Sequence, residues 1–535
     1  MENFILFILI MLGVTVVISI IFFACTWKLF QLAGEKSWKA AIPFLNFYTQ
    51  LKIMHRPTWW MILYFVPIVG FIMFIVIQID FLRLFGKKGT IHTLLGVFFS
   101  IFYLGFWNYQ KDIKFEGVEE RKETLIAALI FAIVFATVIH TFVFQPFTIP
   151  TGSMERTLLV GDFLFVNKMS YGARVPMTPV ALPFLQNKMS LSTKDPGTKP
   201  NSYIDAIRLP YLRFPGYEKV ENNKLVVFNY PMDSLHTAID RKDPYVKRCV
   251  GIPGDVIEMK NGKLFINNKL ENLPVDNERQ SAYYVISKYE FGIEKLESYF
   301  GYFVEFSPQG LNENGSYNYI FPGLTPQDAE KLKKISSVIS MEEIIEPKGN
   351  RISYFNKIEE IANHAQYIFP KDKQGLWNND NMGPLKIPKK GDVITLNPEN
   401  IAQYYLIIKN YEGNESFKIE KNQYILNGNP IKTYTIKQNY YWMMGDNRDN
   451  SLDSRYFGYV PEDHIMGKPV FIWMSWQGIF DNGSKKLRTE RMFKIPNTGI
   501  PLKDKTNYGW YILIGLIIYF GWDFFKKKKP EVDKK

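Results

Sequence analysis

The feature that most constrains the fold is an apolar stretch at residues 124–144, which is followed almost at once by a proline. As a helix, its 21 residues would be about 31 Å long, enough to cross a hydrocarbon core of about 30 Å. Pro146 then ends the helix, because proline has no amide hydrogen to donate. Seven residues later the chain presents Ser153 in a Pro-Thr-Gly-Ser-Met turn. This spacing predicts a membrane anchor with a serine hydroxyl at most about 25 Å from its end.

Other apolar segments predict further membrane spans. Residues 4–27 favour a retained transmembrane helix over a cleaved signal peptide, because the run is long and lacks a basic start. Blocks at 58–84 and 91–107 predict two more spans, but the basic residues between them conflict with the positive-inside rule. A block that does not span, or a re-entrant segment, is the alternative. Residues 508–525 predict a final span, with four lysines directly after it on the cytoplasmic side.

The distribution of charge indicates a multi-pass protein of the inner (cytoplasmic) membrane. Basic loops after the first and third apolar segments place residues 145–507 on the extracytoplasmic face. The formal net charge is +12, but much of the excess lies beside apolar segments, where membrane orientation accounts for it. No basic stripe accompanies a nucleic-acid fold signature, so we expect no nucleic-acid partner.

Cysteine and histidine usage argues against a metal site or a disulfide framework. The chain has two cysteines, Cys25 and Cys249, and six scattered histidines without ligand-like spacing. We therefore predict no metal and no other cofactor.

Residues 145–507 have the pattern of a mainly β domain built from antiparallel sheets. Short β-rich runs alternate with Gly, Pro and Asn turns. The predicted strands are 225–230, 245–251, 256–259, 263–266, 440–444 and 469–473. Asn261-Gly262 predicts a hairpin. A polar, Tyr-rich segment at 276–384 predicts an inserted α+β lobe, with a helix that has Thr325 as N-cap and Pro326 as its first residue.

Lys247 is the first candidate partner for Ser153. It lies in a predicted strand, where alternation places it on one face with Tyr245 and Cys249. Burial of that face would lower the lysine pKa by roughly 3 to 5 units, and the neutral amine could then take a proton from a serine hydroxyl. The alternative is a surface lysine, because lysine is rarely fully buried.

A polar loop at residues 444–461 is the third stretch that bears on chemistry. A calcium loop starting at Asp449 fails, because its sixth position is Ser454 and its twelfth is Val460. The short polar residues instead favour a hydrogen-bonded platform, in which Ser451 contacts the lysine and Asp453 pairs with Arg455. A solvated turn is the alternative.

Four stretches, in this order after a membrane helix, resemble the bacterial type I signal peptidase (leader peptidase) family of Ser-Lys proteases. They are Pro150-Thr-Gly-Ser-Met154 with Thr157-Leu-Leu-Val-Gly-Asp162, Leu225 to Pro231, Tyr245 to Asp255, and Gly445 to Arg455. The resemblance covers about residues 124–275 and 385–480.

The resemblance implies a role for each matching residue. Ser153 is then the nucleophile and Lys247 the general base, while the Thr151 hydroxyl and the Ser153 amide form the oxyanion hole. Ser451 orients the lysine. The supporting ion pair is Asp453 with Arg455. Residues matching the shallow pockets for small substrate side chains are Phe147, Ile149, Met154, Leu158 and Val246.

These observations predict a membrane-bound serine endopeptidase that removes N-terminal signal peptides from exported preproteins through an acyl-enzyme. Its partners would be those preproteins and membrane lipid. Two departures from the family pattern, Glu155-Arg156 before Thr157 and Asn222-Asn223-Lys224 in place of a Gly-Asp turn, put the substrate preference in doubt. A non-catalytic scaffold for exported chains is the alternative from another class. A penicillin-binding-type acyltransferase would need lysine where Arg156 stands.

The predicted organisation combines these assignments. It comprises a membrane domain at 1–110 with about three apolar segments, an anchor at 124–144, a catalytic β domain at 145–275 and 385–500, a lobe at 276–384, and a last transmembrane helix at 508–525.

Overall fold

The computed structural model describes most of the chain and divides it into two compact units, Met1–Val138 and Ile139–Lys535. The described residues are 2–58, 60–61, 69–118, 125–182, 185, 201–233, 238–272, 279–349, 368–370, 377–421, 423–480, 485–496, 509–511 and 515. The predicted domain boundaries remain predictions.

The first unit is helical. Its helices are α1 (Glu2–Leu32), α2 (Leu45–Ile53), α3 (Val69–Arg83), α4 (Thr90–Asn108) and the start of α5 (Leu125–Phe142). The Asn108 side chain joins α4 to α1, because its oxygen accepts the N–H groups of Lys28 at 3.0 Å and Leu29 at 3.2 Å. The paired amides of Gln50 and Gln78 similarly join α2 to α3.

Two helices of this unit bear on the predicted membrane spans. Among the described residues, α4 is long and apolar enough to cross a membrane, and Val16–Leu32 of α1 is a shorter apolar helix. The predicted block at 58–84 includes residues 62–68, and the predicted helix at 508–525 is represented only by 509–511 and 515. Both therefore lie partly or mostly outside the described residues. Multiple spans remain a prediction.

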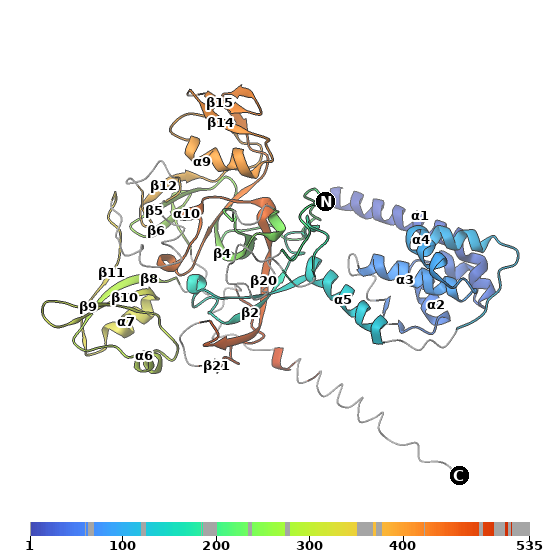
Figure 1. The fold of residues 1–535 in the computed structure, drawn as a ribbon, viewed down its shortest axis with the longest axis horizontal. Coiled ribbons are helices and arrows are strands. Elements are labelled where there is room, and N and C mark those ends of the chain that lie inside the picture. The colour runs from blue at the N-terminus through green and yellow to red at the C-terminus, as the bar shows by residue number, and fades with distance from the viewer. Residues whose placement is uncertain are drawn as a thin grey trace, which may run out of the picture. The chain divides into compact units, whose positions relative to one another are not determined.

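The second unit is built on a mainly antiparallel sheet (Figure 1). Its strands pair in the order β1-β2-β20-β3-β4-β18-β19, and β21 pairs with β20. Their bounds are β1 Phe144–Thr148, β2 Asp162–Asn167, β3 Lys224–Asn229, β4 Pro244–Gly251, β18 Tyr440–Met444, β19 Val460–Pro461, β20 Ile465–Gln477 and β21 Lys486–Leu487. Strand β4 lies inside this sheet, between β3 and β18, so its residues are covered by neighbours on both edges.

Smaller sheets extend the unit. The strands are β5 Val256–Lys260, β6 Lys263–Ile266, β7 Lys269–Leu270, β12 Met382–Lys386, β13 Val393–Thr395, β14 Phe417–Glu420, β15 Gln423–Leu426, β16 Asn429–Ile431 and β17 Thr433–Thr435, with the short helices α9 Ile401–Leu406 and α10 Ser454–Phe457. The predicted hairpin is confirmed. Asn261 and Gly262 both have positive φ, 47° and 72°, and they join β5 to β6 as an Asn-Gly turn requires.

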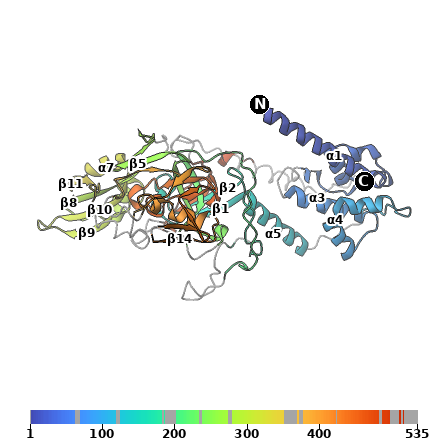
Figure 2. The same cartoon turned by 90° about the horizontal axis from the view of Figure 1, so that it is seen from above.

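A separate lobe of this unit contains β8 Ser281–Ser287, β9 Ser307–Leu311, β10 Tyr317–Leu324, β11 Val338–Glu343, α6 Ile293–Phe300 and α7 Pro326–Lys333. The strands form a four-stranded sheet in the order β11-β8-β10-β9, and both views show α7 beside them (Figures 1 and 2). The predicted helix is confirmed, because the Thr325 hydroxyl caps α7 by accepting the Asp328 N–H at 3.1 Å. The mainly β character predicted for residues 145–507 is likewise confirmed in the described residues.

Candidate active site

A tight turn between β1 and β2 carries Ser153. The backbone is extended at Thr151 and then forms one 3₁₀ turn over Gly152–Met154. Two backbone hydrogen bonds of Ile149, one with Asp162 and one with Gly161, both 2.9 Å, close the base of this segment. Ser153 is only 6% exposed, so the turn holds its hydroxyl inside the protein rather than in bulk water.

Lys247 comes from β4 and meets this turn. Its side chain is 3% exposed, and its Nζ lies 2.5 Å from Ser153 Oγ, although the two residues are 94 positions apart in sequence. The surface-lysine alternative is therefore not what the structure shows. The amine of Lys247 and the hydroxyl of Ser153 are therefore in direct contact inside the protein.

The polar loop after β18 is bonded to the Ser153 turn. The Asn447 N–H donates to the Ser153 carbonyl at 3.2 Å, and the Asn447 side-chain amide donates to the Gly152 carbonyl at 3.0 Å. Gly445 is required at the start of this loop, because a Cβ there would come within 2.2 Å of Ser451 Oγ and 2.5 Å of the Ser153 carbonyl oxygen. The backbones of the loop and of the turn are thus in direct contact, with no room for a side chain at Gly445.

Asp453 and Arg455 form the ion pair that the sequence predicts. Both are buried, and the carboxylate accepts from Nε and Nη2 of the guanidinium, each at 2.9 Å. Asp453 also accepts the Gly445 N–H at 3.1 Å. Burial alone would raise the pKa of Asp453, but Arg455, these hydrogen bonds and the nearby Lys247 together hold it below its usual range. The pair therefore remains ionised and fixes the loop.

Ser451 lies beside Gly445 and the Ser153 carbonyl, because a Cβ on Gly445 would meet both. It is 1% exposed, and its hydroxyl has no hydrogen-bond partner among the residues that the structure describes. The predicted role of Ser451 in orienting Lys247 stays a prediction. Thr151 is half-buried and lines a cavity with Gly152 and Glu155, and its predicted oxyanion role also stays a prediction.

An apolar pocket of about 330 Å³ lies on one side of the turn. Of the five residues predicted to bind substrate, Phe147, Ile149 and Val246 line it, together with Tyr245 and Leu164 among others. The other two are not among its lining residues but pack against residues that are. Met154 and Leu158 are 1% and 0% exposed and pack in one cluster with Ile149. We infer that these two shape the pocket through the residues that line it.

A buried ion pair between Arg248 and Asp446 was missed by sequence reasoning. Both side chains are 0% exposed, and the carboxylate accepts from Nε at 2.8 Å and from Nη2 at 2.7 Å. Asp446 also accepts the Thr157 hydroxyl at 2.6 Å, which links β4, the polar loop and the Ser153 segment. Burial would raise the pKa of Asp446, but Arg248 lowers it below the usual value.

A second contact that the sequence did not predict connects the Ser153 segment to the end of the region 145–507. Arg491 pairs with Asp162 at 2.6 Å, and Asp162 also accepts the Ser475 hydroxyl at 2.6 Å. The sequence did not predict this pairing of Arg491, because its partner lies more than 300 positions earlier. Among the described residues, no group of three or more His, Cys, Asp or Glu side chains is arranged to hold a metal ion.

Comparison with known proteins places this geometry in a family. The family model described as "Signal peptidase, peptidase S26" matches residues 122–309 and 382–476, which is more than half of the chain. The chain belongs to the S26 signal peptidase family. A second model, of a family of unknown function, matches residues 38–118.

Curated relatives named "Signal peptidase I" agree with this assignment. The protein of Buchnera aphidicola subsp. Acyrthosiphon pisum is 27% identical, and the match covers 74% of this chain and 93% of the relative. The protein of Buchnera aphidicola subsp. Schizaphis graminum is 26% identical over 67% of this chain and 77% of its own. The protein of Haemophilus influenzae is 25% identical over 72% and 78%. The four stretches that resemble signal peptidases all lie within the residues matched by the S26 family model.

Proposed function

We propose that this protein is a membrane-bound serine endopeptidase that removes N-terminal signal peptides from exported preproteins by means of a Ser153–Lys247 dyad. The observation that carries the proposal is the 2.5 Å separation of Lys247 Nζ and Ser153 Oγ in a site where both side chains are buried. A serine hydroxyl is a weak nucleophile until an adjacent base accepts its proton, and a desolvated lysine amine can do so.

The acylation step follows from these two groups. The neutral Lys247 amine takes the Ser153 proton as Oγ forms a bond to the scissile carbonyl carbon. The Thr151 hydroxyl and the Ser153 N–H donate to the oxygen that becomes negative. The Lys247 ammonium then gives its proton to the leaving amine as the peptide C–N bond breaks, which leaves the signal peptide esterified to Ser153.

Deacylation uses the same groups with water as the nucleophile. Lys247 takes a proton from the water as its oxygen attacks the ester, and returns that proton to Ser153 Oγ when the signal peptide leaves as a carboxylic acid. Asp453 and Arg455 keep the polar loop fixed beside the dyad, and Ser451 orients the amine. The apolar pocket, lined by Phe147, Ile149 and Val246 with Met154 and Leu158 packed against its lining, accepts the small side chains before the cut.

Attachment to a membrane supplies the substrate in a favourable position. A cleavage site directly follows the apolar segment of a signal peptide. The predicted spans of this chain would hold the dyad on the extracytoplasmic face near the same bilayer, so much of the positioning is provided by proximity.

The test is cleavage of one preprotein by the purified full chain, with sequencing of the new amino terminus. Ser153→Ala and Lys247→Met are each expected to lower kcat at least about 1,000-fold, since each removes a group that acts in both steps. Lys269→Met, in the exposed strand β7, is the matched control and should cleave normally. Normal processing by either dyad variant would refute the proposal and favour the scaffold alternative.

A further inference from the structure

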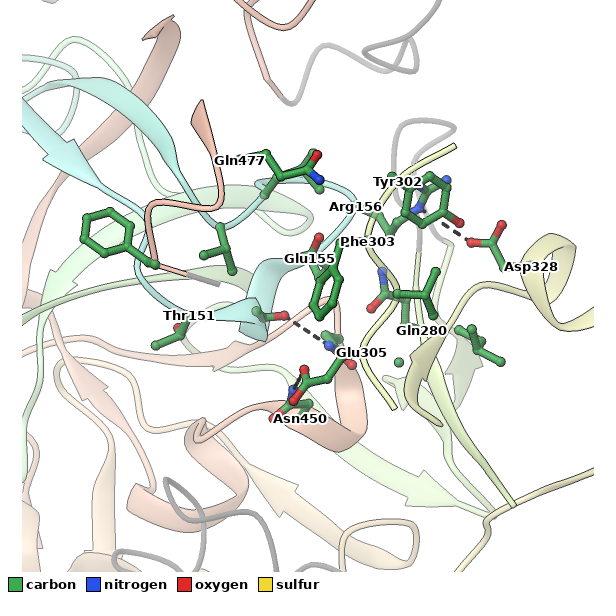
Figure 3. A pocket seen from close by; sticks show the side chains of 18 of the residues that line it. Thr151, Glu155, Arg156, Gln280, Tyr302, Phe303, Glu305, Asp328, Asn450 and Gln477 are labelled. Atoms are coloured by element: carbon green, nitrogen blue, oxygen red, sulfur yellow. Dashed lines mark hydrogen bonds and ion pairs between the residues drawn. The ribbon is translucent and has the colours of Figure 1, made fainter. Parts of the chain in front are cut away.

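A second cavity, the lobe-side cavity, lies beside the Ser153 turn. Its volume is about 350 Å³, within the range of ligand-binding clefts. Residues 150–152 of the turn form part of its lining, and residues 302–305 and 323–324 of the lobe form another part (Figure 3). It shares only Pro150 with the lining of the apolar pocket. Two distinct cavities therefore adjoin the turn that carries the nucleophile.

Three carboxylates and two arginines line the lobe-side cavity. Arg156 lies 3.7 Å from Asp328, and Arg488 lies 4.0 Å from Asp162. Neither Glu155 nor Glu305 forms an ion pair within 4.0 Å in the described part of the chain. Burial is the main cause that raises the pKa of Glu155, to about 7, and of Glu305. Glu305 accepts a hydrogen bond from the Asn450 side-chain amide at 3.2 Å, and its ionised carboxylate would attract a cation and repel an anion.

Unpartnered amides provide an independent sign of a ligand. Gln280 is 1% exposed, and neither atom of its side-chain amide has a hydrogen-bond partner among the described residues. The same holds for the side-chain oxygen of Asn447, which is 3% exposed. Buried polar atoms normally have partners. Both residues line the cavity, and Figure 3 shows Gln280 in its wall.

The third residue of this polar group is a glycine. A Cβ at Gly323 would come within 2.7 Å of the side-chain amides of both Gln280 and Asn447. The missing side chain therefore leaves space for amide groups to lie at the cavity wall. Donors and acceptors of this kind match the alternating N–H and C=O groups of an extended peptide.

We propose that the lobe-side cavity binds the first residues after the cut of an extended preprotein, with Gln280 and Asn447 bonded to its backbone and with Glu305 selecting against acidic side chains. The inference rests on the proposed function. The apolar pocket accommodates the substrate residues before the cut. The substrate residues after the cut therefore enter the other cavity that adjoins the same turn. The lobe thereby contributes to substrate selection.

The test uses one preprotein in three forms, with Lys, Gln or Glu at the second position after the cut and alanine at the first. The full-length wild type should cleave the Lys and Gln forms with a kcat/KM at least about fivefold higher than the Glu form, as expected for one partly screened charge contact. Glu305→Gln should reduce this ratio to less than about twofold, and Glu305→Lys should reverse it. Gln280→Ala should lower kcat/KM for all three forms by a similar factor, because it removes backbone contacts.

Glu313→Gln is the matched control, because Glu313 lies exposed in the turn between β9 and β10. It should keep the wild-type ratio. Cleavage of the Gln form by each Glu305 variant shows that the variant is folded. An unchanged charge ratio in both Glu305 variants, or equal cleavage of all three forms by the wild type, would overturn this inference while leaving the proposed function intact. Failure of the wild type to cleave any form would instead refute the proposed function, and this inference with it.

Discussion

At the scale of single residues, the local environment decides the protonation of groups around Ser153. Lys247 and Asp453 lie in the same buried region, yet they face different electrostatic surroundings. The Arg455 charge keeps Asp453 ionised, whereas the amine of Lys247 contacts the Ser153 hydroxyl and acts on Asp453 from a greater distance. One small site therefore holds an ionised carboxylate and the amine that we propose as the base.

The raised pKa of Glu155 should be visible in how the stability of the protein depends on pH. Its pKa is raised from 4.5 to about 7, chiefly by burial, with Arg488 and Arg491 opposing the shift. The unfolded chain ionises this group near pH 4.5, so between about pH 4.5 and 7 the folded state retains a proton that the unfolded state has lost. The free energy of unfolding should therefore fall as pH rises through this window.

Glu155→Gln should remove the part of the pH dependence of stability that comes from this carboxyl group. The free energy of unfolding of the variant, relative to that of wild type, should rise by about 1 to 2 kcal/mol between pH 4 and pH 8. The full pKa shift would give a larger value, but the side chain still partly reaches solvent. The measurement is thermal or denaturant unfolding of the full chain at both pH values. Parallel stability curves for variant and wild type would contradict the assignment.

At the scale of elements, the site depends on how closely the polar loop approaches the Ser153 turn. Gly445→Ala should force these two segments apart, since the new methyl group would meet both Ser451 Oγ and the Ser153 carbonyl oxygen. We expect kcat to fall by about 100-fold and the free energy of unfolding to fall by about 1 to 3 kcal/mol.

Gly292→Ala is the matched control for this substitution. Gly292 has a negative φ of −95°, and a Cβ there would meet no atom within 4 Å. Its cleavage rate and stability should remain close to wild type. Equal rates for Gly445→Ala and Gly292→Ala would show that the loop tolerates displacement.

The elements also explain which parts of the site could be predicted from sequence. Strand spacing and turn residues were sufficient for the β5–β6 hairpin, the cap of α7 and the strand that carries Lys247, because those signals are local. The Arg248–Asp446 pair was not predictable in this way. Alternation separates the two faces of a strand, but it does not show that neighbouring segments cover both faces of β4.

The lobe-side cavity was similarly beyond sequence reasoning. Gln280 is one polar residue in a polar segment, and its significance arises only from burial beside Asn447, 167 positions later. The resemblance to signal peptidases did direct attention to Ser153, Lys247 and the Asp453–Arg455 pair. It gave no information about the lobe, because the lobe had no counterpart in the four stretches.

At the scale of the whole molecule, the family match and the compact units divide the chain at similar places. The S26 match begins at residue 122, and a different family matches residues 38–118. The first compact unit ends at Val138, within α5. These boundaries favour the prediction that the amino-terminal helices are a module distinct from the peptidase region.

Deletion of residues 1–118, which keeps the predicted anchor at 124–144, should therefore leave the rate of signal-peptide cleavage within about threefold of the full chain. The measurement is cleavage of the same preprotein in membranes that contain equal amounts of each protein. A loss greater than about 100-fold, with normal membrane insertion, would show that the first module contributes directly to catalysis.

The contact between Asp162 and Arg491 has a consequence for synthesis on the ribosome. Asp162 emerges soon after the nucleophile, but its cation emerges only when nearly the whole wet region has been translated. The loop with Asp453 is also translated late, so a nascent chain contains Ser153 and Lys247 before the surroundings that hold them together. We therefore expect the proposed dyad to become active only when translation is almost complete, which would keep an unfinished copy from cutting neighbouring chains.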